Sequence, residues 1–230
     1  MVDFSIEVYS YIRVTDNVVF LITSTTIATW IIMGVLIAFG IVVRIQSRQW
    51  DPVKKPTRLQ NIMEMCVETF EKFFRSSASE KLDYLAPWFF TLFAFLLFSN
   101  ISGVFGIRNP TADWGVTFPL AVTSFILIQF VGFRYHPKSH LKGFIEPNFL
   151  FLPLNIMGEL AKPISLSFRL FGNILGGFIL MSLLYGLAPF VVRLIFPVAL
   201  HLYFDIAAGA LQAFIFTVLS LTFVGLAAGD

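Results

Sequence analysis

The chain has 230 residues, of which 57% are hydrophobic and only 13% are charged, with a formal net charge of +2. A water-soluble domain carries about a quarter of charged residues, so this composition excludes that class and indicates a membrane protein. The basic residues lie between apolar runs, which gives no indication of nucleic-acid binding. Cys66 is the single cysteine, so the sequence predicts neither an intramolecular disulfide nor a cysteine-based zinc site.

The first part of the chain contains apolar runs long enough to cross a bilayer, which takes roughly 20 residues each. We expect an external N-terminus over residues 1–17 and membrane spans over residues 18–43, 85–106 and 116–133. Basic residues cluster directly after the first and third of these spans, at Arg44, Arg48, Lys54, Lys55 and Arg58 and at Arg134, Lys138 and Lys142. Such clusters mark the cytoplasmic side of a membrane, which places the N-terminus outside.

Residues 44–83 are predicted to form a cytoplasmic loop followed by an amphipathic helix. Apolar side chains recur there at helical spacing, at Ile62, Met63, Cys66, Val67, Phe70, Phe73 and Phe74. Charged side chains fill the other side, at Glu64, Glu68, Glu71 and Lys72. This pattern predicts a helix that lies on the cytoplasmic membrane surface or, alternatively, packs against a soluble partner.

The last two apolar runs, residues 148–192 and 194–228, are too long for simple membrane crossings. About forty residues of helix extend roughly 60 Å, twice the ~30 Å of a hydrocarbon core. We therefore expect two long helices that are strongly tilted or broken, with Arg193 at the outer turn between them. The sequence thus predicts an all-α membrane protein with about five spans, a single membrane domain and a cytoplasmic C-terminus.

A permanently charged residue, Arg169, lies near the middle of the first long run. Its placement at bilayer depth costs at least ~2.5–3.5 kcal/mol, so a chain that keeps it is expected to use the charge. Lys162 and Asn173 fall on nearly the same side of the predicted helix. Gly172 and Gly176 have the spacing that lets a second helix approach closely, although ordinary helix packing also explains them. This side of the helix is predicted to meet a negative charge on a neighbouring helix.

Ionisable and polar residues also lie along the final predicted helix, at His201, Asp205 and Gln212. Asp205 lies about ten residues, or roughly 15 Å, inward from its outer end. Glu159 lies ten residues to the cytoplasmic side of Arg169, so the two acids fall on opposite sides of the arginine. This order is expected of a cation path interrupted by a fixed positive charge. The alternative is that Arg169 pairs with Glu159 or Asp205 and only joins helices.

The sequence indicates no metal or cofactor site. His136 and His140 have the spacing of a metal-binding pair, but Pro137 follows the first and no third ligand is near. The chain also lacks the glycine-rich phosphate-binding motif of nucleotide-binding proteins. We therefore expect no metal and no cofactor.

Two segments strongly resemble subunit a of F-type ATP synthases: Lys162-Pro-Ile-Ser-Leu-Ser-Phe-Arg-Leu-Phe-Gly-Asn173 and Leu211-Gln-Ala-Phe-Ile-Phe-Thr-Val-Leu219. The likeness extends more loosely to Ser99-Asn100 and Pro110-Thr-Ala-Asp113 and covers the chain from about Leu59 onward. The resemblance implies a non-catalytic subunit whose last two helices face a c-ring in a bacterial plasma membrane. Its expected partners are the c-ring, the peripheral-stalk b subunits, the other synthase subunits, lipid, and the translocated H⁺ or Na⁺.

In that family, the arginine that corresponds to Arg169 faces the ion-carrying carboxylate of the c subunits and separates two aqueous half-channels. Asn173 and Gln212 match positions that help to place this arginine. The expected ion path consists of Asn173, Gln212, Asp205, Glu159, Lys162 and His201. A secondary cation transporter is the alternative from another class of protein.

The chain departs from many relatives at three positions of the outer half-channel. Phe178 stands where many relatives have glutamate, Asp205 where many bacterial relatives have histidine, and Gly103 where some have aspartate. Asp205 is therefore expected to serve alone in the outer half-channel.

Overall fold

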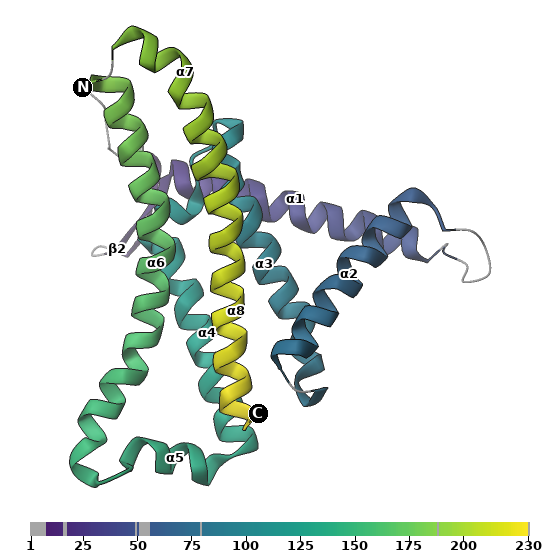
Figure 1. The fold of residues 1–230 in the computed structure, drawn as a ribbon, viewed down its shortest axis with the longest axis vertical. Coiled ribbons are helices and arrows are strands. Elements are labelled where there is room, and N and C mark those ends of the chain that lie inside the picture. Colours follow the sequence, from purple (N-terminus) through teal and green to yellow (C-terminus); the bar gives the residue numbers. More distant parts are fainter. Residues whose placement is uncertain are drawn as a thin grey trace.

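The computed structural model of the chain is almost entirely helical (Figure 1) and describes residues 8–15, 18–48, 50, 56–78, 80–187 and 189–229. Its α-helices are α1 (Ser24–Ser47), α2 (Arg58–Ser77), α3 (Ala86–Ile101), α4 (Trp114–Tyr135), α5 (Pro137–Ile145), α6 (Leu152–Leu187), α7 (Phe190–His201) and α8 (Gly209–Ala228). Short 3-10 helices lie at Glu80–Leu85, Ser102–Phe105, Pro110–Ala112 and Phe149–Phe151. Five helical segments of the described chain are long and apolar enough to cross a membrane, which confirms the predicted all-α membrane fold.

A two-stranded hairpin precedes the first helix. Strands β1 (Val8–Thr15) and β2 (Val18–Thr23) pair antiparallel. The predicted start of the first span at residue 18 is therefore wrong, because the β-branched residues of β2 favour extended backbone. The side chain of Thr23 accepts a hydrogen bond from the backbone N–H of Thr26 and caps α1. The rest of the expected external segment, residues 1–7 and 16–17, lies outside the described residues.

Helices α3, α4, α6 and α8 form the packed bundle. Figure 1 shows α6 and α8 side by side, and α4 packs against both, while α3 packs against α8. Buried side chains from these helices make the core, including Phe89, Leu92, Leu96, Ala121, Ile128, Val131, Leu166, Leu170, Phe216 and Val224. The core thus lies on one side of the α6–α8 pair, and the described residues leave the opposite side of the pair uncovered.

The connection between the two long runs differs from the prediction. Helix α6 ends at Leu187 and α7 begins at Phe190, so Arg193 lies inside α7 and not at the turn. Pro189 explains the position of the break, since proline lacks a backbone N–H and disfavours helical backbone in the residue before it. Helix α6 has 36 residues and is about 54 Å long, in agreement with the surplus length expected from the sequence.

A segment of π-helix, Leu202–Ala208, joins α7 to α8. The sequence predicted one helix over residues 194–228, and the helical path is indeed continuous but widened at this segment. Segments of π-helix are rare and frequently occur at functional sites. Asp205 lies within it.

Helices α1 and α2 extend away from the bundle (Figure 1). Only Thr25, Ala28 and Ile32 of α1 are buried, and α2 buries only Phe70 and Phe74. Helix α2 covers the stretch predicted to be an amphipathic helix. Of the predicted cytoplasmic loop, residues 49, 51–55 and 79 lie outside the described residues. The basic cluster after the third predicted span lies at the end of α4 and in α5.

Candidate functional site

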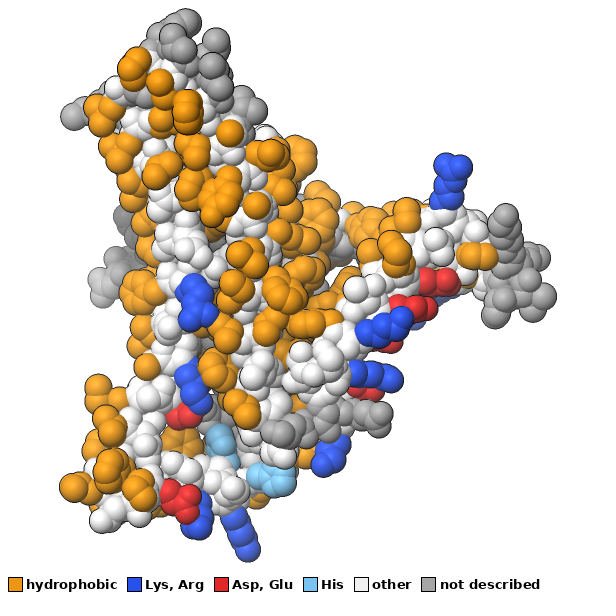
Figure 2. Space-filling view, in the orientation of Figure 1, with side chains coloured by type: hydrophobic (Ala, Val, Ile, Leu, Met, Phe, Trp, Pro, Cys, Tyr) orange, Lys and Arg blue, Asp and Glu red, His pale blue; other side chains and the backbone are white. Residues whose placement is uncertain are grey.

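The uncovered side of α6 carries Arg169. Leu166 and Leu170 are 5% and 0% exposed and point into the core, whereas Arg169 is exposed. In Figure 2, basic side chains stand on α6 within a surface that is otherwise mainly apolar side chains and backbone. A charged side chain in such surroundings needs a polar or charged partner, because apolar surroundings do not stabilise its charge.

Neither acid that the sequence offered as an internal partner contacts Arg169. Glu159 Oε1 makes a close ion pair with Lys162 Nζ, and Asp205 Oδ2 lies 2.7 Å from His201 Nδ1. Among the residues that the structure describes, no carboxylate bonds to Arg169. The structure therefore contradicts the pairing on which the helix-joining alternative depended.

Asn173 and Gln212 meet between the two helices. Asn173 Nδ2 on α6 donates to Gln212 Oε1 on α8 at 2.7 Å. Gln212 is only 2% exposed, and its Nε2 has no hydrogen-bond partner among the described residues. Asn173 lies one helical turn after Arg169, so this bond fixes α8 next to the arginine.

Two glycines leave the side of α6 beside Arg169 open. A Cβ atom added at Gly172 or Gly176 would meet nothing within 4 Å. A Cβ atom at Gly177 would instead lie 3.1 Å from the ring of Phe204. Gly177 thus serves packing within the chain, whereas Gly172 and Gly176 pack against no described residue. Ordinary helix packing, the other explanation of this glycine pair, could therefore involve only a helix that lies outside the described residues.

The outer part of the site surrounds Asp205. Its side chain is 17% exposed, against 46% for His201. A Cβ atom at Gly103 would lie 2.6 Å from Asn109 Oδ1 and 3.2 Å from Asp205 Oδ1. Glycine at position 103, where some relatives have aspartate, thus leaves room for both polar groups.

Two asparagine side chains hold this outer part together: Asn100, which lies in a segment that resembles subunit a, and Asn109, which the sequence analysis did not select. Asn109 Nδ2 donates to the backbone oxygen of Asn100 at 3.0 Å. Asn100 Nδ2 in turn donates to the backbone oxygen of Gly209, the first residue of α8, at 2.8 Å. The signal that indicates them is the presence of asparagine next to and within an apolar span.

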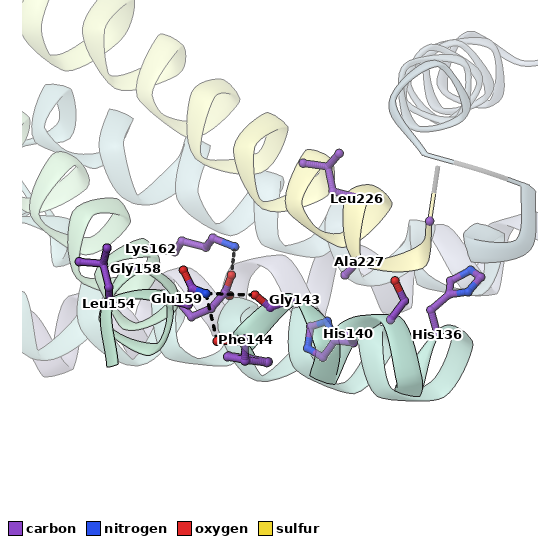
Figure 3. Close-up of a pocket in the computed structure, with 13 residues that line it drawn as sticks. His136, His140, Gly143, Phe144, Leu154, Gly158, Glu159, Lys162, Leu226 and Ala227 are labelled. Carbon is purple, nitrogen blue, oxygen red and sulfur yellow. Dashed lines mark hydrogen bonds and ion pairs between the residues drawn. The ribbon is translucent and has the colours of Figure 1, made fainter. Parts of the chain in front are cut away.

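The inner part of the site is a cavity of about 720 Å³ between α5, the beginning of α6 and the end of α8. Figure 3 shows Glu159 and Lys162 on the α6 side, His140 and Phe144 on α5, and Leu226 and Ala227 on α8. Gln129 Nε2 on α4 donates to Glu159 Oε2 at 3.2 Å. The predicted residues Glu159 and Lys162 thus lie together, while Gln129 and His140 are neighbours that the sequence did not indicate.

Residues 26–225 match the sequence profile of the family described as ATP synthase A chain. The chain is 34% identical to the ATP synthase subunit a, sodium ion specific, of Propionigenium modestum over 92% of this chain and 76% of that protein. It is 35% identical to ATP synthase subunit a of Moorella thermoacetica, over 88% of this chain and 89% of that protein. It is 34% identical to ATP synthase subunit a 2 of a Bradyrhizobium species, over 91% and 90%.

Proposed function

The chain belongs to the ATP synthase A chain family, and from that premise we propose that it is the ion-translocating subunit a of an F-type ATP synthase. In this proposal Arg169 separates two aqueous half-channels at the surface of a c-ring. Ion flow through them turns the ring and drives ATP synthesis in a separate soluble part of the complex. The family assignment replaces the alternative of a secondary cation transporter.

The observation that carries the proposal is the exposed Arg169 with no bonded carboxylate among the described residues. Since the described residues supply no counter-charge, we infer that another polypeptide supplies it. At an effective dielectric constant of about 20, a carboxylate ~4 Å away attracts the guanidinium by about 4 kcal/mol. An attraction of this size keeps a passing c-subunit carboxylate ionised and makes it release its ion. The fixed positive charge also repels cations that would otherwise leak between the half-channels.

The remaining predicted residues divide along the ion path. Glu159 and Lys162 line the inner cavity, and we assign them to the inner half-channel. Asp205 and His201 belong to the outer half-channel, where the carboxylate stands in place of the histidine of many relatives. Asn173 and Gln212, bonded at 2.7 Å, hold α6 against α8 beside the arginine.

The proposal includes the partners and the orientation in the membrane. The uncovered side of α6 and α8, with Gly172 and Gly176, faces the c-ring, and the peripheral-stalk b subunits hold the chain static. The chain lies in a bacterial plasma membrane with its N-terminus outside and its C-terminus in the cytoplasm, as the basic clusters indicate. The coupling ion is H⁺ or Na⁺, and the Propionigenium modestum relative bears the sodium-specific name.

Arg169→Ala in the whole complex tests the proposal. We expect a complex that assembles but has lost ion-driven ATP synthesis, because the c-ring carboxylate keeps its ion and the barrier between the half-channels is gone. Lys72→Ala, which removes an exposed charge on α2, is the matched control and should leave synthesis unchanged. Coupled synthesis that survives in Arg169→Ala would overturn the proposal.

A further inference from the structure

The inner cavity contains a histidine, His140, whose ring is held by close packing. A Cβ atom at Gly132 on α4 would lie 2.6 Å from two ring atoms of His140, so only glycine gives this ring its place. Phe133 and Phe144 contact the same ring edge-on, with centroids 4.9 Å and 5.4 Å away. The ring therefore projects from α5 and packs against α4. It lines the same cavity as Glu159 and Lys162 (Figure 3).

A chain of hydrogen bonds connects this ring to Glu159. His140 Nε2 lies 2.8 Å from Gln129 Oε1, and Gln129 Nε2 donates to Glu159 Oε2 at 3.2 Å. Because the amide N–H₂ of Gln129 faces the carboxylate, its oxygen faces the imidazole. His140 must then donate through its Nε2–H. The carboxylate and the imidazole thus hold the amide of Gln129 from its two ends.

Glu159 receives hydrogen bonds on both carboxylate oxygens. Lys162 Nζ donates to Oε1, and Gln129 Nε2 donates to Oε2. The side chains of Glu159 and Lys162 are 25% and 33% exposed, so the pair is partly open to the cavity. Lys162 has a flexible stem and a rotatable ammonium group. The rigid connection of the carboxylate is therefore the one through Gln129 and His140.

We propose that His140 is a positioning residue of the inner half-channel, which acts through Gln129 to hold the Glu159 carboxylate where ions enter and leave the cavity. This inference rests on the proposed function. If the ring of His140 is displaced, the amide oxygen of Gln129 loses its hydrogen bond, and the side chain is free to move away from Glu159. The carboxylate then loses a fixed donor. Ion exchange on the inner side weakens, and the outer part of the site, around Asp205, is unchanged.

The test uses the whole complex in liposomes and ATP-driven ion uptake, in which ions enter from the side of the inner half-channel. The measured quantities are the maximal rate and the ion concentration that gives half-maximal uptake. The probes are NaCl at fixed pH and H⁺ in sodium-free buffer. Gly132→Ala and His140→Phe should each raise the half-saturating concentration of the transported ion roughly three- to tenfold, with a nearly unchanged maximal rate.

Two further variants control for packing. His140→Gln keeps an N–H donor at a similar distance and should restore a half-saturating concentration near that of the unmodified complex. Gly143→Ala adds a methyl group at the same cavity, where a Cβ atom meets nothing within 4 Å, and should have no effect. The two His140 variants keep the test decisive if Gly132→Ala fails to assemble.

An unchanged half-saturating concentration in His140→Phe would overturn the inference. A loss of maximal rate alone, shared by His140→Gln, would show a merely structural role and would overturn it too. Arg169→Ala, measured in parallel, separates this outcome from failure of the proposed function. If Arg169→Ala abolishes coupled transport while the His140 variants behave normally, only the inference about His140 fails.

Discussion

Replacement of Gly176 by leucine should lower the rate of ion-driven ATP synthesis without damage to the fold of this chain. A Cβ atom at Gly176 meets nothing within 4 Å, so the added side chain fits as far as this chain is concerned. Leucine is also a better helix former than glycine by up to ~0.8 kcal/mol, so α6 gains stability. The side chain instead projects from the side of α6 that carries Arg169, toward the proposed c-ring.

The size of the effect follows from helix packing. Packed helices lie about 8–10 Å apart, and small residues permit the lower limit. A leucine that moves the partner helix outward by ~2 Å lengthens an Arg169–carboxylate distance from about 4 to about 6 Å. At an effective dielectric constant of about 20, the attraction falls from about 4.2 to about 2.8 kcal/mol. The loss of about 1.4 kcal/mol corresponds to a roughly tenfold lower rate of coupled synthesis.

The assay is ion-gradient-driven ATP synthesis by purified complexes in liposomes, expressed per assembled complex. Gly177→Leu is the neighbouring comparison, since a Cβ atom there lies 3.1 Å from Phe204 and a larger side chain overpacks the helix pair. That strain costs about 1–3 kcal/mol, so Gly177→Leu should first reduce the amount of assembled complex. An assembled Gly176→Leu complex with unreduced synthesis would refute the reasoning that this side of α6 receives a partner helix.

Two further predictions concern single hydrogen bonds of the site. Asn173→Ala should lower the free energy of unfolding of the subunit by about 0.6–1.7 kcal/mol in denaturant titrations in micelles. Gln212→Leu should lower it by less in the Asn173→Ala variant than in the unmodified subunit, and strictly additive losses would show that their hydrogen bond contributes nothing. His201→Ala removes a hydrogen bond to the Asp205 carboxylate worth about 1.5–3 kcal/mol, so the rate of ion-driven synthesis should fall about tenfold or more. His201→Gln keeps a hydrogen-bond donor, so the rate should fall less. Equal losses in the two His201 variants would exclude a role for that bond.

The main architecture was predictable because membrane helices are visible in composition alone. Arg169 stood out because a permanent charge inside an apolar run has a large, known cost. The beginning of α1 was not predictable in this way, since hydropathy does not separate an apolar strand such as Val18–Thr23 from an apolar helix. Proline at position 189 is itself a sequence signal for the break between α6 and α7, but the prediction placed the turn at the nearby charged residue Arg193.

The parts of the site that depend on contacts between distant segments were not predictable. The His140–Gln129–Glu159 connection joins three helices, and it depends on the missing side chain at Gly132. Nothing in the local sequence around His140 indicates that partner. The π-helix at Leu202–Ala208 is mainly apolar like its α-helical neighbours, and Asp205 within it gives no signal of a wider helix, so only the tertiary structure reveals it.

If the chain faces a c-ring as proposed, the exposed guanidinium of Arg169 has a consequence for how the complex is built. A newly inserted chain that has not met its ring holds this charge against lipid, at a cost of at least ~2.5–3.5 kcal/mol. Docking of an acidic rotor helix removes that cost, so membrane insertion and subunit assembly are energetically linked. The orphan chain is thereby less stable than the assembled one, which favours cells that synthesise the two subunits in step.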